Sequence, residues 1–134
     1  MMKHILPLCL FYMIIMFCQV PQVQGKKFDI AVLQGLDKVT ARVSTFRVAV
    51  GTTIQFGTLK ITVRTCDKRP PEETPESAAF INVYETRPGE STIRVYSGWM
   101  FASSPALAAM EHPVYDVWVV DCINNKIDLL KNKN

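Results

Sequence analysis

The sequence predicts an all-β fold, a small antiparallel barrel or sandwich with one short helix near residues 104–110. Two patterns predict it: apolar segments of strand length, and turn-forming residues that recur at intervals of about 8 to 12 positions. The chain has 134 residues, of which 49% are hydrophobic and eight are prolines. This length suffices for one small domain and not for two, which excludes most large enzyme folds.

A cleavable signal peptide is predicted for residues 1–25. Lys3 precedes an uncharged apolar run, Ile5–Cys18, and Val23 and Gly25 suit the −3 and −1 positions of a signal-peptidase site. The alternative is an uncleaved leader that anchors the chain in the inner membrane, but the run is shorter than the roughly 20 residues that a span needs. We therefore expect a periplasmic protein with no integral membrane span after processing.

The first β-hairpin is predicted around Gly57-Thr58, because a two-residue turn with Gly first fits type II′. Ala41 and Val43 are out of phase with the apolar residues that follow them, so we expect a bulge or break near Ser44-Thr45. The alternating apolar residues change parity across the turn, which keeps both sets on one face: Phe46, Val48, Val50, Ile54 and Phe56 before it, and Leu59, Ile61 and Val63 after it.

A second hairpin is predicted from Ala79–Thr86 and Ser91–Ser97. The Pro-Gly pair of the intervening Arg87-Pro88-Gly89-Glu90 suits a type II turn. Between the two hairpins, Asp67–Ser77 contains three prolines and many charged residues. Proline lacks an N–H for a strand ladder and the charges need water, so this segment is expected to be a surface loop.

The C-terminal third predicts one helix and one strand. Ser103-Ser104-Pro105 offers a Ser N-cap and a Pro at N1, which favours a helix of about two turns that ends near Glu111. The run Val114–Cys122 is apolar on both parities and predicts a central strand buried on both sides. The single β domain is thus expected to span residues 26–122, followed by a polar tail over 123–134.

Two of the four cysteines, Cys9 and Cys18, lie in the predicted leader, which leaves Cys66 and Cys122. An oxidising compartment makes a disulfide the default for these two. A redox or metal site would need a second Cys or His nearby in sequence, and neither cysteine has one. Because His112 is the only histidine after the leader, we predict no metal site, and we predict no cofactor.

Charge argues against nucleic-acid binding. The formal net charge is +3, and without Lys3 it is +2, from 14 basic and 12 acidic side chains. No strongly basic cluster accompanies this small excess. Asp116 and Asp121 interrupt the apolar C-terminal strand, so we expect each to form an ion pair, with Arg42, Arg64 or Arg94 as the partner. The alternative places both carboxylates at the rim of a ligand groove.

Catalysis has candidates but no motif. Ser103, Ser104, His112 and Asp116 could be imagined as a hydrolase site, yet no Gly-x-Ser-x-Gly elbow is present and both serines are better explained as helix caps. The sequence therefore does not favour an enzyme.

Binding candidates lie in the proline-rich loop and in the Trp99–His112 segment. Pro70-Pro71 favours a pre-ordered extended shape that offers charged side chains at low entropic cost, although a solvated connector is the alternative. Trp and Tyr are also enriched at binding hot spots, although Trp99 could equally be a core residue. The residues assigned to binding are Arg69, Pro70, Pro71, Glu72, Glu73, Trp99 and His112.

Five segments carry a resemblance to a known family: Leu36–Arg42, Phe56–Leu59, Lys68–Phe80, Ser97–Leu107 and Glu111–Trp118. Over about residues 36 to 122 the chain resembles the bacterial exported family catalogued as domain of unknown function 2155. The resemblance implies a signal peptide and two cysteines like those found here, which supports the disulfide. It implies no established reaction, substrate or cofactor.

These observations predict a non-enzymatic protein of the periplasm or cell envelope. It would bind an envelope protein or a cell-wall component, as a binding or structural module, and no nucleic acid. The alternatives are a small periplasmic hydrolase and an inhibitor of a wall-degrading enzyme, the latter without support from any particular residue.

Overall fold

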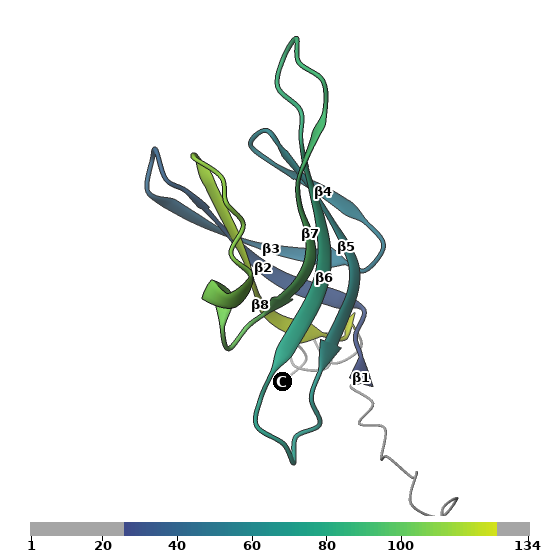
Figure 1. Cartoon of the computed structure of the whole chain (residues 1–134). Helices are drawn as coiled ribbons and strands as arrows, with labels where there is room; N and C mark the ends of the chain where they lie inside the picture. The colour runs from purple at the N-terminus through teal and green to yellow at the C-terminus, as the bar shows by residue number, and fades with distance from the viewer. Residues whose placement is uncertain (1–25, 126–134) are drawn as a thin grey trace, which may run out of the picture.

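The computed structural model describes residues 26–125, which form two antiparallel sheets packed face to face (Figure 1). The larger sheet has the order β1-β5-β6-β7, with β4 also pairing with β5, and the smaller sheet has the order β3-β2-β8. Of the two predicted architectures, the sandwich is therefore correct. The elements are β1 (Lys26–Lys27), β2 (Ile30–Asp37), β3 (Arg42–Ala49), β4 (Thr53–Phe56), β5 (Leu59–Lys68), β6 (Ser77–Glu85), β7 (Ile93–Phe101), the 3₁₀ turn η1 (Pro105–Ala108) and β8 (Tyr115–Ile123).

The core lies between the two sheets and is supplied by alternate residues of the strands, as half-buried strands require. In β6 the inward positions repeat every second residue throughout the strand, whereas in β5 a bulge between Val63 and Thr65 shifts them. The fully buried apolar side chains from both sheets are Ala31, Leu33, Val48, Leu59, Ile61, Val63, Ala79, Ile81, Val83 and Val119. No helix within residues 26–125 is long and apolar enough to cross a membrane.

Both predicted hairpins are confirmed. In the first, Phe56 pairs with Leu59, and Gly57 has φ +58° while Thr58 has no positive φ, as a type II′ turn requires. The Tyr115 hydroxyl packs against the Gly57 backbone and leaves no room for a Cβ there. In the second hairpin the turn Arg87-Pro88-Gly89-Glu90 is closed by a 3.1 Å hydrogen bond from the last N–H to the first carbonyl.

The segment before the first hairpin differs from the prediction. The β2–β3 register runs without a shift from Ile30↔Ala49 to Asp37↔Arg42, so the expected bulge near Ser44-Thr45 is absent. Val43 is instead 56% exposed. The apolar residues on either side of Gly51, which has φ +85°, also belong to different sheets, because the chain leaves β3 and enters β4 there. A positive φ of this kind favours glycine.

The strand after the 3₁₀ turn is an edge strand and not the predicted central one. β8 pairs only with β2, and its inward residues include Val117 and Val119. The prediction failed because the outward side also carries apolar residues: Trp118 donates its indole N–H to Gln34 on the open face, and Val120 is 41% exposed. Apolar residues on both parities therefore did not mean burial on both sides.

The predicted helix near residues 104–110 is only the single 3₁₀ turn η1. Ser104 occupies the N-cap position but makes no side-chain cap bond, and no residue of η1 is buried. Leu107 is 81% exposed. Because η1 buries none of its residues, it lacks the packing that stabilises helices, and a helix this short is marginal without packing.

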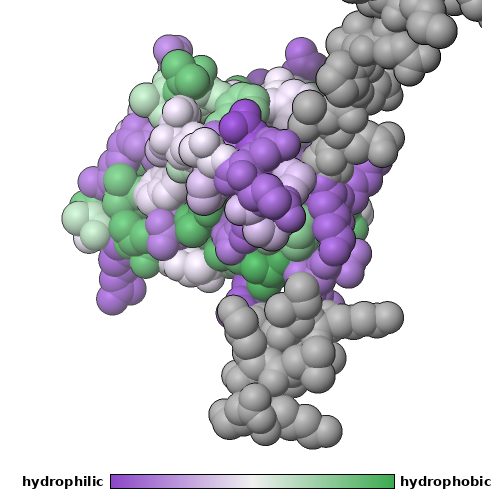
Figure 2. Space-filling model, turned by 90° about the horizontal axis from the view of Figure 1, so that it is seen from below, coloured by the Kyte–Doolittle hydropathy of each residue, from purple (hydrophilic) through white to green (hydrophobic). Residues whose placement is uncertain are grey.

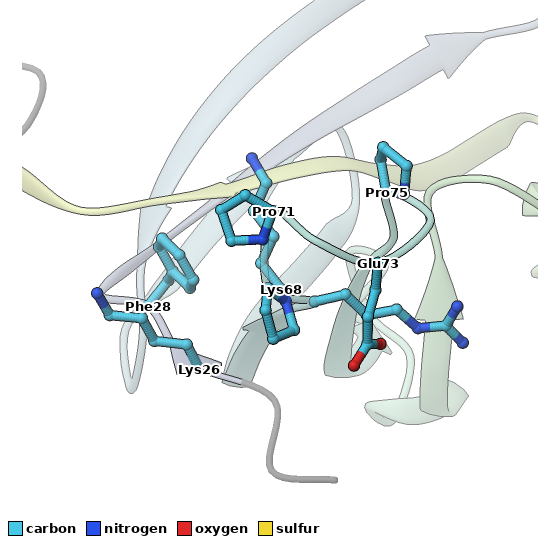
Figure 3. A pocket seen from close by; sticks show the side chains of 8 residues that line it. Lys26, Phe28, Lys68, Pro71, Glu73 and Pro75 are labelled. Atoms are coloured by element: carbon cyan, nitrogen blue, oxygen red, sulfur yellow. The ribbon is translucent and has the colours of Figure 1, made fainter.

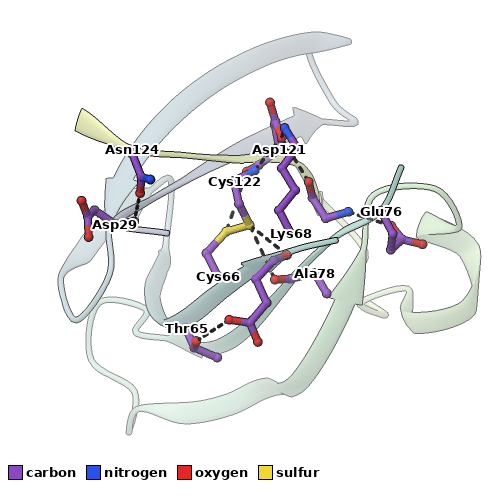
Figure 4. Close-up of a disulfide and its surroundings, with 11 residues drawn as sticks. Asp29, Thr65, Cys66, Lys68, Glu76, Ala78, Asp121, Cys122 and Asn124 are labelled. Atoms are coloured by element: carbon purple, nitrogen blue, oxygen red, sulfur yellow. Dashed lines mark hydrogen bonds and ion pairs between the residues drawn. A yellow bond between two sulfur atoms is a disulfide. The ribbon is translucent and has the colours of Figure 1, made fainter. Parts of the chain in front are cut away.

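The two ends of the sandwich are closed by different interactions. At one end the Cys66–Cys122 disulfide joins β5 of the larger sheet to β8 of the smaller sheet, with a Cα–Cα distance of 5.7 Å (Figure 4). At the other end the rings of Phe46, Phe56 and Tyr115 connect the sheets, with centroids 5.1 Å apart in each successive pair. The predicted disulfide is thus present, whereas the predicted leader and most of the predicted tail lie outside the described residues.

We expect loss of the disulfide to cost about 4 kcal/mol of unfolding free energy, because the bridge closes a loop with a sequence separation of 56 residues. Urea unfolding of Cys66→Ala, Cys122→Ala and the double variant measures this. All three should lose the same amount, since each removes the same bond. A double variant much less stable than either single variant would show that the thiols also contribute separately.

Candidate functional site

The proline-rich loop between β5 and β6 is ordered by hydrogen bonds at its base and within its turn. The Arg69 N–H donates to the Glu76 carbonyl at 3.0 Å, and the Glu73 N–H donates to the Pro70 carbonyl at 3.1 Å. Residues 71–75 are all exposed. As predicted, Asp67–Ser77 places a loop at the surface, although its first two residues and its last still belong to strands.

Glu76 fixes this loop to the segment that follows β7. Its carboxylate accepts hydrogen bonds from the Ser103 hydroxyl and from the backbone N–H groups of Ser103 and Ser77. Burial opposes ionisation, but these hydrogen bonds and the nearby Arg69 outweigh it and hold the pKa of Glu76 below its ordinary value. Ser103 is therefore neither a helix cap nor a free nucleophile.

A pocket of about 510 Å³ opens between this loop and the segment that joins β1 to β2 (Figure 3). Phe28 lies on one side, and Pro71 and Pro75 of the loop lie on the other. The lining is mostly apolar, with charged groups around it. The full set of lining residues is Lys26, Phe28, Lys68, Arg69, Pro70, Pro71, Glu73 and Pro75.

A second carboxylate, that of Asp121, lies beside the disulfide at this end of the molecule (Figure 4). It accepts hydrogen bonds from Lys68 Nζ at 2.7 Å, from the Cys122 N–H at 2.8 Å and from the Ser77 hydroxyl at 3.1 Å. Burial raises the pKa of Asp121, but these partners more than offset it and the pKa is lowered. The predicted ion pair exists, with a lysine as partner and not an arginine.

Asp116 likewise pairs with a lysine. Lys38 Nζ lies 3.1 Å from its carboxylate and also donates to the His112 carbonyl at 2.8 Å. The predicted partners Arg42, Arg64 and Arg94 were wrong for both aspartates. Spacing along single strands could not show that the lysines are presented from a turn and from the neighbouring sheet.

His112 is buried at the opposite end of the molecule from the loop. Its Nδ1 accepts the N–H groups of Val114 and Tyr115 at 3.1 and 3.0 Å. The proton of the neutral ring is therefore on Nε2, which lies 3.0 Å from the Glu85 carboxylate and donates to it. Both ring nitrogens are occupied, and the ring is stacked on Tyr115 at 5.4 Å.

Glu85 is the acceptor at the centre of this cluster. Besides His112 it accepts hydrogen bonds from Arg87 Nε at 2.7 Å and from the Thr58 hydroxyl at 3.1 Å. Burial works against the charge, but the bonds from Arg87, His112 and Thr58 together lower the pKa of Glu85. The sequence contained a signal for this residue, since it shares the inward parity of Ile81 and Val83.

The structure does not assemble the hydrolase constellation. Ser103 is bound to Glu76 just before β6, whereas His112 is bound to Glu85 at the end of that strand, about 30 Å away at the usual rise per residue of a strand. Asp116 is held by Lys38, and Ser104 starts η1. These four residues therefore form no catalytic site with one another.

The predicted contact surface is also divided. Arg69, Pro70, Pro71, Glu72 and Glu73 gather in the loop, and Figure 2, seen from the end where this loop projects, shows hydrophilic residues in front of and beside apolar ones. His112, which was also predicted to take part in binding, does not belong to this surface, because it is buried at the other end.

Trp99 lies on the outer face of the larger sheet. It is 39% exposed and stacks edge-on against Phe80 of the neighbouring strand, with ring centroids 5.7 Å apart. Lys26 and Phe28 could not be predicted as lining residues from the sequence, because only the folded chain brings them opposite the loop.

Removing the buried carboxylate is expected to be costly. Glu85→Ala should lower the unfolding free energy by about 3 kcal/mol, because it leaves the buried His112 N–H and the Thr58 hydroxyl without their acceptor. Chemical denaturation at neutral pH measures this. Glu90→Ala, in the exposed turn of the same hairpin, is the matched control and should change stability by less than about 0.5 kcal/mol.

The pH dependence of stability gives a second test of Glu85. Because the folded-state pKa of Glu85 lies below the unfolded value of about 4.3, its stabilising effect is complete above that pH and is lost as the pH falls through the folded pKa. The stability difference between the wild-type protein and Glu85→Gln should thus shrink below about pH 4. A difference that stays constant down to about pH 3 would contradict the assignment.

Comparison with known proteins gives a family and no activity. The chain is 29% identical over 87 residues to "Uncharacterized protein RP359" of Rickettsia prowazekii (strain Madrid E), a match that covers 65% of this chain and 56% of that relative. The aligned part thus spans little more than half of the relative's length. No solved structure matches the chain.

A family model matches residues 31–122, which run from the second residue of β2 to the next-to-last residue of β8. The match extends over the loop, Glu85 and His112, and over both cysteines of the disulfide. The chain therefore belongs to the family described as "Uncharacterized protein conserved in bacteria (DUF2155)".

Proposed function

We propose that this chain is an exported, non-enzymatic binding module of the bacterial cell envelope that holds another envelope protein at the end of the sandwich formed by the β5–β6 loop. The observation that carries the proposal is the combination of an exposed, hydrogen-bonded loop with a largely apolar pocket behind it. Membership in a family conserved in bacteria and the predicted signal peptide support the location.

The order of the loop matters because binding costs less when the contact element is already fixed. Its base is tied by Arg69 and Glu76, and Glu76 is tied in turn to Ser103 across the end of the sheet. The two prolines in its first turn further restrict the free chain. Concave, mostly apolar sites with a few polar groups are where proteins bind ligands and partner side chains.

Processing of the leader is the first test. Cleavage after Gly25 should give a mature chain whose N-terminal residue is Lys26 and which fractionates with the periplasm. Intact-mass measurement of the protein recovered from cells, together with N-terminal sequencing, decides this. A full-length chain in the inner-membrane fraction would contradict cleavage and support the alternative of an anchored module.

The contact surface is tested by site-specific photocrosslinking in living cells. A photoreactive amino acid at Glu72, in the exposed part of the loop, should capture one defined envelope protein. The same amino acid at Glu90, in the exposed turn at the opposite end, should not. The double variant Arg69→Ala and Glu76→Ala removes the Arg69 side chain and the Glu76 carboxylate that anchors the loop. It should reduce the amount of captured partner at least several-fold.

Capture of the same partner from both positions, or capture that is unchanged in the loop variants, would show that the contact surface is not the loop. Recovery of cell-wall fragments without any protein would instead assign the module to the wall. Circular dichroism and the urea midpoint of each variant show whether the fold is intact, so that loss of capture is not confused with unfolding.

A further inference from the structure

We propose that the pocket behind the loop binds an acidic segment of the partner protein, with one apolar side chain between Phe28 and the loop prolines and a neighbouring carboxylate against Lys26 and Arg69. This assignment rests on the proposed function and adds the chemistry of the ligand. It uses residues from both walls of the pocket, so it is specific to the folded chain.

The dimensions suit a side chain with its neighbours. The volume of about 510 Å³ falls within the roughly 300 to 1,000 Å³ of ordinary ligand pockets. Phe28, Pro71 and Pro75 supply rigid apolar walls that face one another (Figure 3). The aliphatic stem of Lys68 extends the apolar lining while its ammonium group reaches Asp121. An apolar side chain placed there would be removed from water on several sides.

The charges around the pocket select an acidic ligand. Three cations line it, Lys26, Lys68 and Arg69, against one carboxylate, Glu73. The Lys68 charge is already matched by Asp121 at 2.7 Å, and Arg69 lies close enough to Glu76 to lower the pKa of that carboxylate. Lys26 and Arg69 are both exposed, so a ligand carboxylate can reach them. The planar guanidinium of Arg69 is suited to a carboxylate, which it can bind with two parallel hydrogen bonds.

The predicted processing would add to this charge. Cleavage after Gly25 would create an α-ammonium group on Lys26, which lines the pocket. Such a group has an ordinary pKa of about 7.7 to 8.0 and is largely protonated at neutral pH. Maturation would therefore increase the attraction for a carboxylate at the same place.

A protein segment is favoured over an anionic membrane. The loop that forms one wall carries Glu72, Glu73 and Glu76, and the first two are exposed. A flat anionic surface would meet these carboxylates as it approached, and like charges repel. A single extended chain can place its carboxylate beside Lys26 and Arg69 without approaching the tip of the loop.

The test uses amide-detected NMR titration of the processed protein, purified from cells, with three capped pentapeptides. The probes carry a central Glu-Leu-Glu, Lys-Leu-Lys or Glu-Ser-Glu sequence between glycines. The first should give saturable shifts at the amides of Phe28, Arg69 and the loop, and it should bind at least fivefold more tightly than the other two. Vesicles of phosphatidylglycerol are the fourth probe and should produce no binding.

The charge assignment is tested with the double variant Lys26→Glu and Arg69→Glu. Affinity for the acidic apolar peptide should fall at least tenfold, and the basic peptide should become the better ligand. Lys60→Glu with Arg94→Glu makes the same change of charge at two exposed positions on β5 and β7 and is the matched control. Its affinity should stay within twofold of the wild-type value.

Equal binding of the basic peptide, shifts confined to residues outside the pocket, or binding to vesicles alone would each overturn the ligand class. If photocrosslinking from Glu72 succeeds while the acidic peptide does not bind, the binding module stands and only this inference fails. If crosslinking from Glu72 fails while the peptide binds in the pocket, the pocket chemistry stands and the proposed partner surface fails.

Discussion

The disulfide between Cys66 and Cys122 is the constraint on which the loop end of the molecule depends. It joins the C-terminal part of β5 in the larger sheet to β8 at the edge of the smaller sheet, and no ladder among the described strands connects the two sheets there. The Lys68–Asp121 pair and the Ser77 hydroxyl lie beside it: Asp121 precedes Cys122, Lys68 follows Cys66 by two residues, and Ser77 begins β6. Because β5 and β6 are fixed there, the loop between them starts and ends at defined positions, and so does the pocket that it borders.

At the opposite end the two sheets are held together by the buried Glu85–His112 pair and by the aromatic rings packed next to it. Glu85 and His112 are buried together, and the His112 ring stacks on Tyr115, which contacts Phe56 of the other sheet. His112, one of the four catalytic candidates, is therefore hydrogen-bonded and packed inside this end of the sandwich. Every hydrogen-bonding position of the histidine ring is filled, as buried polar groups require.

Local sequence patterns predicted what depends on neighbours in the chain. The Gly57-Thr58 and Pro88-Gly89 turns, the surface loop and the disulfide could all be found, because turn chemistry and the pairing of two remaining cysteines need no tertiary knowledge. The change of sheet at Gly51 and the edge position of β8 could not, since periodicity does not say which strand lies alongside. The pocket was missed for the same reason: its walls, Phe28 and Pro71, are far apart in sequence.

The pairing of β2 with β8 also sets the order in which this chain can fold. β2 is the middle strand of the smaller sheet, and one of its two neighbours is the last strand of the domain. Contacts of such long sequence separation form slowly, because the intervening chain must first be closed into a loop. A chain emerging from its N-terminus can build the β5–β6–β7 meander early, but the smaller sheet stays incomplete until β8 has emerged. The chain therefore reaches its final fold only after nearly all of the domain has been synthesised.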